Sequence, residues 1–210
     1  MSHLSQFFAV AVIHFLALVS PGPDFAMISR SSLVYSRRTG IYSALGLALG
    51  ILVHVTYSLI GIGLIISKSI LLFSIIKYLG AGYLIYIGWK SLRARRVTQS
   101  AHDPVASERH LPALAALRIG FLTNVLNPKV TLFFLGLFTQ VIRTDTPLWL
   151  QVLYGLEMAT MTFVWFAFVA SVLSHSMIRR RFIAVQHIVE RCCGGLLVAL
   201  GVRVALDQTR

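Results

Sequence analysis

The sequence has few charged residues for its length. Asp, Glu, Lys and Arg make up 12% of the 210 residues, about half of the share in a typical soluble domain. A soluble fold of this size leaves a large fraction of its area in contact with water. It could not hide a chain that is 57% hydrophobic. The composition therefore predicts an integral membrane protein in a lipid bilayer.

Acidic residues are scarcer still, with 7 Asp and Glu against 19 Lys and Arg and a net charge of +12. In a soluble protein this imbalance would suggest a nucleic-acid partner. Here the arginines form short clusters between apolar runs, which is typical of cytoplasmic loops. Nucleic-acid binding is therefore not expected.

Motifs for cofactors and covalent chemistry are missing. The two cysteines, Cys192 and Cys193, are neighbours, and neighbours on a helix point about 100° apart, so they are poorly placed to pair. There is no cluster with zinc or haem spacing and no phosphate loop. Neither G-x-S-x-G nor H-E-x-x-H occurs. We expect no metal, no cofactor and no enzymatic activity, and ATP hydrolysis within this chain is not expected.

Long apolar stretches are what the sequence does contain. A spanning helix needs about 20 largely apolar residues, and six candidates are present. They cover residues 4–34 (interrupted at 20–24), 41–66, 69–89, 113–141 (interrupted near 127), 148–174 and 183–206. We predict an all-α protein with six transmembrane helices and three parts: a first three-helix repeat (1–92), a cytoplasmic linker (93–112) and a second three-helix repeat (113–210).

The basic residues predict the orientation. They gather in the first, third and fifth loops: Arg30, Arg37, Arg38, Lys90, Arg93, Arg95, Arg96, Arg109, Arg118, Arg179, Arg180 and Arg181. The second and fourth loops hold only Lys68 and Arg143. Since cytoplasmic loops carry the excess of Lys and Arg, the odd loops should be cytoplasmic and both termini should lie outside.

Two halves of three helices each would then be inverted relative to one another. The stretches AGYLIYIGWK (81–90) and GGLLVALGVR (194–203) align without gaps, each with two glycines at matching positions. Convergence on close helix packing is the alternative explanation. The two interrupted helices are each the first in their half, with breaks about 15 to 17 residues from the helix start, near the bilayer midplane. Paired interruptions of this kind indicate a transporter binding site.

The first predicted break lies in SPGPD, residues 20–24. Pro21 and Pro23 cannot both sit inside a regular helix, because proline lacks an N–H and clashes with the preceding turn. Gly22 permits the backbone angles of a break, and proline favours the first position of a new helix. We therefore predict a second half-helix that begins at Pro23 and Asp24.

The second predicted break lies in TNVLNPKVTLFF, residues 123–134. Asn127 is a good N-cap, Pro128 suits the first helical position, and Lys129 follows directly. Asn124 lies about one turn before Asn127, where it could either cap a helix end or bind a ligand.

The breaks have chemical consequences. Backbone groups left unpaired at membrane depth must face protein or a wet cavity, and helix N-termini attract carboxylates. Asp24 and Lys129 follow the prolines at equivalent positions with opposite charges. The ammonium of an α-amino acid could meet Asp24, and its carboxylate the free N–H groups and Lys129. A permanent Asp24–Lys129 salt bridge and a proton-linked role for Asp24 are the alternatives.

Glu157, in YGLEMATMTF, is a second carboxylate at membrane depth. Such a group is costly and usually faces the bundle interior or a cavity. We expect Glu157, like Asp24, to take part in proton coupling, with a structural hydrogen bond as the alternative for Glu157. His14 is expected to be a core histidine bonded to a carbonyl, and His54 is a weaker site candidate.

SPGPD in the first helix and NPK in the fourth, with six spans and a basic central loop, resemble the lysine exporter (LysE) superfamily. The stretch IHFLALVSPGPDFAMIS is similar to the first helix of its homoserine/threonine (RhtB) branch, particularly threonine efflux proteins, and the likeness extends along essentially the whole chain. The resemblance implies proton-driven export of amino acids from the bacterial cytoplasm through the inner membrane. It also implies two family motifs here, the first with Pro21, Gly22, Pro23 and Asp24 and the second with Asn124, Asn127 and Pro128.

We therefore predict a multi-pass secondary exporter of small, threonine- or homoserine-like amino acids. The two halves would rock about a midplane site in alternating access. Its partners are the substrate, protons and the bilayer, and a homo-oligomer is compatible with the pattern. The alternative is export of an inorganic cation or another small metabolite, although metals usually need more ligands than Asp24, Glu157 and the asparagines supply. An intramembrane enzyme has no support, because no nucleophile–base spacing is present.

Overall fold

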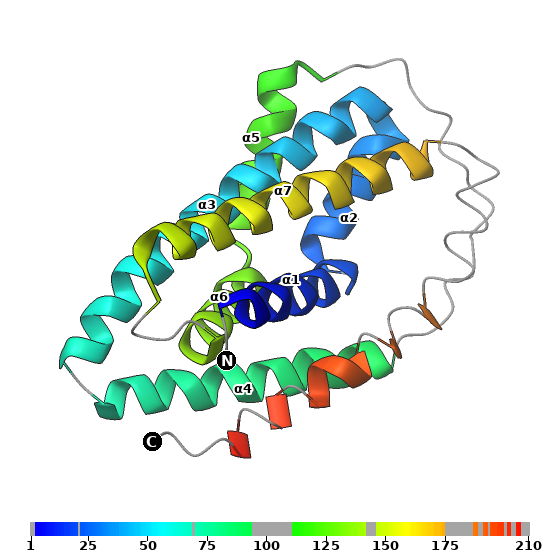
Figure 1. Cartoon of the computed structure of the whole chain (residues 1–210). Coiled ribbons are helices and arrows are strands. Elements are labelled where there is room, and N and C mark those ends of the chain that lie inside the picture. Colours follow the sequence, from blue (N-terminus) through cyan, green and yellow to red (C-terminus); the bar gives the residue numbers. More distant parts are fainter. Residues whose placement is uncertain are drawn as a thin grey trace.

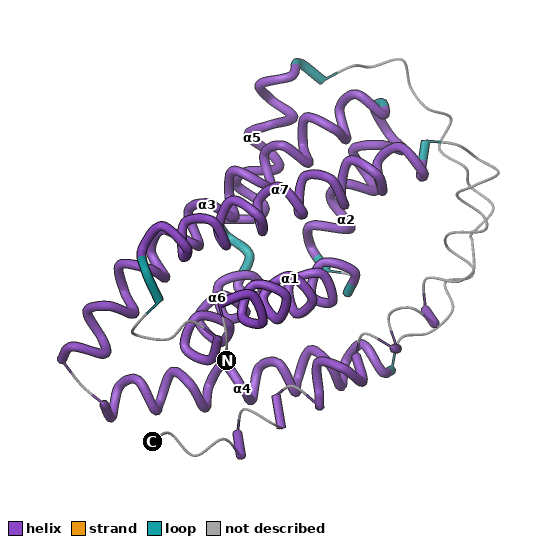
Figure 2. The backbone as a smooth tube through the Cα atoms, in the orientation of Figure 1, coloured by secondary structure: helices purple, strands orange, loops and turns teal. Residues whose placement is uncertain are grey.

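The apolar stretches form long helices that cross one another at a range of angles in the computed structural model of the chain (Figure 1). The structure describes residues 3–20, 22–68, 70–93, 111–141 and 146–174, and short pieces at 187–188, 191–192, 194–199, 201–202 and 205–206. Every regular element in these residues is helical (Figure 2). The predicted all-α class is therefore confirmed for the described part of the chain.

The helices follow the predicted stretches closely. They are α1 (His3–Val19), α2 (Pro23–Arg30), the π-helical turn η1 (Ser31–Tyr35), α3 (Arg37–Lys68), α4 (Ile70–Leu92), α5 (Ala113–Val125), α6 (Pro128–Val141) and α7 (Leu148–Leu173). The largest difference is at the start of α3, which begins at residue 37 rather than 41. The π-helical turn between α2 and α3 was not expected from the sequence.

Membrane-spanning length and composition are met by two described helices, by Arg37–Ile60 within α3 and by the whole of α7, Leu148–Leu173. The bent pair His3–Val19 and Pro23–Tyr35 would make a third span, with 58° between its two parts. The predicted sixth helix is described only in short pieces, and most of the 93–112 linker lies outside the described residues. The arrangement as six spans in two inverted repeats therefore stays a prediction.

The first and fourth predicted helices are both interrupted. The first stops at the end of α1 and resumes at Pro23, the start of α2; the fourth stops at the end of α5 and resumes at Pro128, the start of α6. A proline at the first helical position leaves no N–H unpaired there. Both predicted interruptions are confirmed, although Pro21 itself lies outside the described residues.

Helices α3 and α5 approach one another very closely, because glycines on each helix face the backbone of the other. An added Cβ would collide with the Leu117 carbonyl at Gly46 and with the Ser43 carbonyl at Gly120. The Ser43 hydroxyl also donates a hydrogen bond to the Ala116 carbonyl at 3.1 Å. Small residues permit such packing of helices. It holds the end of α5, where the second break begins, against the middle of α3.

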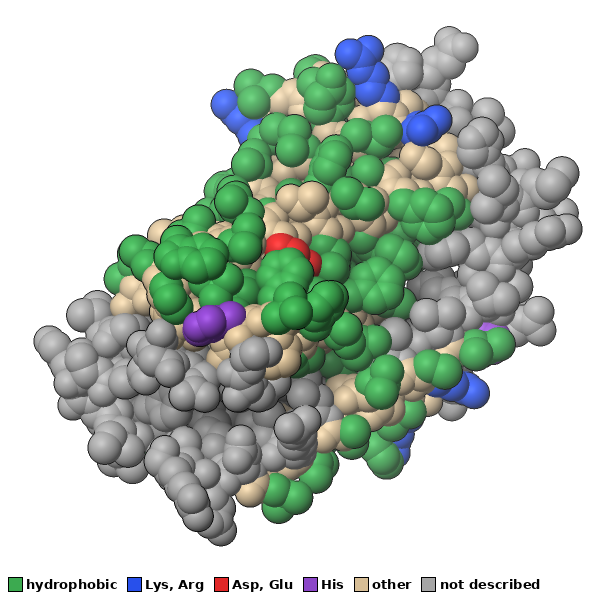
Figure 3. Space-filling view, in the orientation of Figure 1, with side chains coloured by type: hydrophobic (Ala, Val, Ile, Leu, Met, Phe, Trp, Pro, Cys, Tyr) green, Lys and Arg blue, Asp and Glu red, His purple; other side chains and the backbone are tan. Residues whose placement is uncertain are grey.

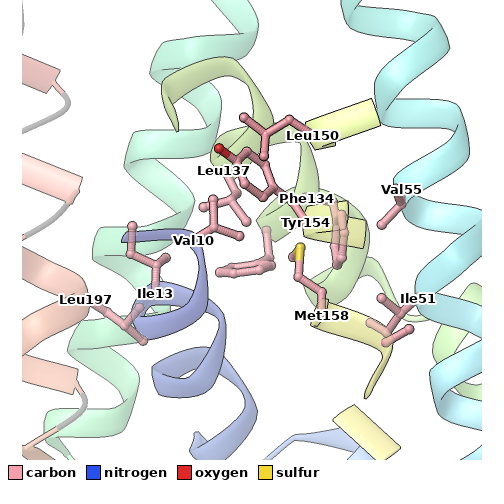
Figure 4. Close-up of a cluster of buried hydrophobic side chains, with 12 residues drawn as sticks. Val10, Ile13, Ile51, Val55, Phe134, Leu137, Leu150, Tyr154, Met158 and Leu197 are labelled. Atoms are coloured by element: carbon pink, nitrogen blue, oxygen red, sulfur yellow. The ribbon is translucent and has the colours of Figure 1, made fainter. Parts of the chain in front are cut away.

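Two clusters of buried side chains fill the bundle at different levels. The first, shown in Figure 4, contains Val10, Ile13, Ile51, Val55, Phe133, Phe134, Leu137, Leu150, Tyr154, Met158, Ala159 and Leu197. The second contains Leu18, Ile28, Ala44, Leu47, Phe166, Val169, Ala170 and Leu173. Along α3 and α7 the clusters occupy successive stretches of the helix. Members of both clusters lie against the polar side chains of the two breaks, since both contribute to the lining of one cavity.

The outer surface is largely apolar. Figure 3 shows hydrophobic side chains over the middle of one face, with Lys and Arg side chains toward its margins. Leu126 is 74% exposed and Trp149 is 68% exposed. Exposed apolar patches of this extent mark contact with something other than water. Lipid is the environment that fits the predicted spans.

Candidate functional site

Asp24 is buried at the start of α2, with 8% of its surface exposed. Its Oδ2 accepts a hydrogen bond from Asn124 Nδ2 at 2.8 Å, and its Oδ1 accepts one from Asn127 Nδ2 at 3.0 Å. The N-terminal end of α2 adds a partial positive charge that stabilises the carboxylate. Side chains predicted from two distant motifs therefore meet at one carboxylate.

Asn127 links the starts of two half-helices. Besides donating to Asp24, it accepts a hydrogen bond at its Oδ1 from the backbone N–H of Lys129 at 3.0 Å. This is the N-cap interaction expected for α6, and it satisfies a donor that the break would leave unpaired. The predicted capping role of Asn127 is confirmed.

Lys129 reaches across to the end of α1. Its Nζ donates to the Ser20 carbonyl at 2.7 Å and lies 3.5 Å from the Ala17 carbonyl. The last carbonyls of a helix have no partner within the helix and carry a partial negative charge, so an ammonium is stabilised there. The Lys129 ammonium, which comes from the fourth predicted helix, therefore binds the carbonyls that the break in the first helix leaves exposed.

Gly22 was expected to permit the backbone angles of the break, but its main effect is to leave space for Lys129. It is the N-cap of α2 in an extended conformation, with φ −160° and ψ −166°, which other residues also adopt. An added Cβ would lie 3.2 Å from both Cδ and Nζ of Lys129. A side chain here would require Lys129 to shift by a few tenths of an ångström, so glycine gives the lysine room, whereas the extended backbone angles themselves do not call for glycine.

A cavity of about 430 Å³, counted with its space open to the outside, lies between the two breaks. Its polar lining is Ser20, Gly22, Asp24, Asn127 and Lys129, and its remaining lining is His14, Ala17, Leu18, Phe25, Ile51, Val130, Phe133, Phe134 and Phe166. Ligand pockets typically combine an apolar lining with a few placed polar groups. The cavity has this character, with opposite charges on its wall.

Two histidines lie beside the breaks and the cavity, although the sequence pattern made neither a strong site candidate. His54, from α3, lies within hydrogen-bond distance of the Asn124 carbonyl (Nε2, 3.0 Å) and of the Tyr57 hydroxyl (Nδ1, 2.6 Å), and so supports the second break. Its spacing of four residues from Gly50 and eight from Gly46 places it on the face of α3 that contacts α5. That spacing is the signal by which His54 could have been found.

His14 lines the cavity and is 2% exposed. Its Nε2 lies 3.4 Å from the Thr162 hydroxyl, and its buried Nδ1 has no hydrogen-bond partner among the described residues. The prediction of a core histidine bonded to a carbonyl is therefore wrong in its second part. The reason is that His14 faces α7 and the cavity rather than a free carbonyl of a neighbouring helix.

Glu157 lies apart from the cavity, on α7. Both of its carboxylate oxygens are buried and have no hydrogen-bond partner in the part of the chain that the structure describes. The structural hydrogen bond considered as an alternative is not present there. Across the described ranges, no group of three or more His, Cys, Asp or Glu is arranged to hold a metal ion.

The apolar helical bundle and the cavity with opposite charges on its wall define a class, that of membrane proteins built around a site for a small polar solute. The chain belongs to the LysE type translocator family, whose sequence profile matches residues 15–208. The resemblance drawn from SPGPD and NPK is confirmed. The chain is accordingly a membrane transporter and not an enzyme.

Relatives cover nearly the whole chain. A threonine efflux protein of Salmonella typhi is 31% identical over 212 residues, which is 98% of this chain and 100% of the relative. A threonine efflux protein of Escherichia coli (strain K12) is 28% identical over 208 residues, with the same coverage. An uncharacterized membrane protein of Bacillus subtilis (strain 168), YrhP, is 29% identical over 198 residues, which is 91% of this chain and 94% of the relative. No solved structure matches the chain.

Proposed function

We propose that this protein exports small amino acids, threonine- or homoserine-like, from the bacterial cytoplasm across the inner membrane, by alternating access coupled to proton antiport. Two relatives that match 98% of the chain are named threonine efflux proteins. The observation that carries the proposal is the pairing of a buried carboxylate with an ammonium on the wall of one cavity, Asp24 on one half and Lys129 on the other.

An amino acid is a zwitterion, and the cavity offers a complement to both of its charges. The Asp24 carboxylate is held by neutral amides, which fix its position without cancelling its charge. The substrate ammonium would bind near Asp24 and the carbonyls at the end of α1. The substrate carboxylate would bind Lys129. We favour this substrate contact over a permanent Asp24–Lys129 lock, because each side chain also has neutral partners that keep it in place without the other.

The position of the site suits alternating access. Side chains of both apolar clusters line the cavity, Leu18 and Phe166 from one and Ile51, Phe133 and Phe134 from the other, so that a movement of either cluster would change access to the site. Broken helices whose ends meet near the membrane midplane are a common construction of transporters that rock about a fixed site. The half-helices α2 and α6 would then move with their own halves and carry Asp24 and Lys129 with them.

Proton coupling would use the two carboxylates of the described spans. A carboxylate within a membrane protein is expensive unless it has a partner or a function. Both Glu157 oxygens are buried and have no hydrogen-bond partner among the residues that the structure describes, which supports Glu157 as a proton carrier. Asp24 could carry the proton instead, since its charge would also control binding of the substrate ammonium.

The test uses purified protein in proteoliposomes loaded with labelled threonine. We expect a pH gradient to drive accumulation against the threonine gradient. Asp24→Asn should lower efflux by about a hundredfold or more, which corresponds to about 2.7 kcal/mol, with normal membrane insertion. Glu157→Gln should retain threonine exchange and lose gradient-driven accumulation. If the pH gradient changes neither rate nor extent, proton antiport is wrong although export stands. A deletion strain sensitive to metal ions instead of threonine would favour the alternative of cation export.

A further inference from the structure

The cavity has a second polar position that the zwitterion does not use. The charged groups gather where the two helices break, whereas His14 lies further back along α1 among aromatic side chains. Its ring centroid is 6.0 Å from that of Phe133 and 6.3 Å from that of Phe134. These contacts and the Thr162 hydroxyl fix the imidazole in one orientation. A rigid polar group in an otherwise apolar wall is typical of a specificity determinant.

The buried Nδ1 of His14 has no partner among the described residues. A polar atom left unsatisfied in a buried position is destabilising, and each such atom in a native structure calls for an explanation. The other ring nitrogen is already engaged with Thr162. A ligand in the cavity that carries a hydrogen-bonding group would remove this cost.

The lining of the cavity indicates which part of that ligand His14 would meet. Asp24 and Lys129 lie at the breaks, whereas His14 lies further back along α1 on the same cavity wall. A ligand whose charged groups bind at the breaks would therefore turn its side chain toward His14. A hydroxyl can both donate and accept, so it suits either tautomer of His14.

We propose that His14 is the specificity-determining residue of this transporter, and that its Nδ1 binds the side-chain hydroxyl of the substrate. The inference rests on the proposed function and deepens it, because it assigns the part of the site that selects among amino acids. Asp24 and Lys129 recognise groups that every amino acid has. His14 distinguishes a hydroxyl from a methyl group of the same size.

The experiment compares threonine with valine, in which a methyl group replaces the hydroxyl. In proteoliposomes, the wild-type protein should export threonine at least about tenfold more efficiently than valine, measured as kcat/KM, since a site built for a hydroxyl rejects the analogue that lacks it. His14→Phe should reduce the threonine-to-valine ratio to within about threefold by lowering threonine export alone. His14→Gln keeps a donor and an acceptor and should restore part of the ratio. Phe133→Leu, the control, changes the wall without removing a polar atom and should affect both substrates alike.

Each result decides the matter. An equal loss of both substrates in His14→Phe would show a structural role and overturn the assignment. Equal export of threonine and valine by the wild-type protein would overturn the hydroxyl contact and leave amino-acid export standing. Export of neither would overturn the proposed function together with it. Should His14→Phe fail to fold, His14→Gln and the wild-type protein still give a result, because threonine and not valine should raise the Tm of the purified wild-type protein.

Discussion

The two broken helices satisfy the backbone groups that their breaks leave unpaired in different ways. At the α5–α6 break, Asn127 caps the new helix with its own side chain, and the N–H groups of Leu126 and Asn127 still bond to carbonyls of α5 at 3.1 and 3.0 Å. At the α1–α2 break, Gly22 provides no side-chain cap. There the Ser20 carbonyl takes its hydrogen bond from Lys129, which belongs to the other broken helix. The second break caps its new helix with its own side chain, whereas the first takes a hydrogen-bond donor from the other broken helix.

The difference indicates where the protein can respond to its substrate. A substrate ammonium bound at the α1 carbonyls would replace that of Lys129 and so release α6 from α1. The second break keeps its cap whether the cavity is filled or empty. We therefore expect the first break to change between the states of the transport cycle and the second to move as a rigid unit.

The largest expected effect follows from removing the Lys129 ammonium, which donates to the Ser20 carbonyl at the first break. Lys129→Met keeps most of the side-chain length and removes the ammonium, which leaves the Ser20 carbonyl without this donor. An unsatisfied buried carbonyl costs about 1–3 kcal/mol, so the Tm should fall. Threonine efflux from proteoliposomes should fall about a hundredfold, because the substrate carboxylate also loses its cation, at about 1.4 kcal/mol for each tenfold.

Lys129→Arg is the matched control, since it keeps the positive charge and should retain most of the stability. Its efflux should lie between those of the wild type and Lys129→Met, because a guanidinium is larger than the room left beside Gly22. Wild-type efflux and Tm in Lys129→Met would show that the first break does not depend on its external partner, and the contrast between the breaks would fail.

The positions of the breaks could be predicted from the sequence, because proline and asparagine act locally. Pro23 and Pro128 start helices, and Asn127 caps one, through their own covalent structure. The ranges of the long helices follow from the lengths of the apolar runs in the same way. The meeting of Asp24 with Asn124 and Asn127 was expected only as a shared cavity, since a sequence does not specify which amide faces which oxygen.

The supports of the site could not be predicted, because they depend on how closely helices approach. Gly50 was not singled out, although the Asn124 side chain lies against it. Lys129 was expected to face Asp24 or substrate, and its contact with the Ser20 carbonyl required knowing that α6 passes the end of α1. The glycines of α3 matter because α5 packs against them, and the sequence does not show which helices pack together.

A smaller effect is expected from a larger residue at Gly50 of α3, which would push against Asn124 beside the second break. In Gly50→Ala the added Cβ would lie 2.6 Å from Asn124 Oδ1 and 2.8 Å from Asn124 Cβ. Overpacking of this kind typically costs about 1–3 kcal/mol, so the Tm should fall. Efflux should drop about tenfold as Asn124 moves away from Asp24, which matches the loss of about one hydrogen bond to a charged group.

Gly82→Ala is the control, because nothing lies within 4 Å of a Cβ at Gly82. Alanine is the better helix former, so this variant should be as stable as the wild type or slightly more so. If Gly50→Ala behaves like Gly82→Ala, then α5 is free to shift away from α3. The second break would then be less rigid than the comparison states.

The smallest effect separates the two bonds that Asn127 makes. Serine is nearly as good an N-cap as asparagine, but its side chain is too short to donate to Asp24 Oδ1. Asn127→Ser should therefore change the free energy of unfolding by less than about 1 kcal/mol and lower threonine efflux about three- to tenfold. Asn127→Ala should lower both the stability and the efflux. Thermal unfolding and efflux, measured on both variants, test this difference. A self-contained second break requires that serine preserve its stability. If serine and alanine destabilise the protein equally, the cap contributes little, and the second break is held by its neighbours as the first one is.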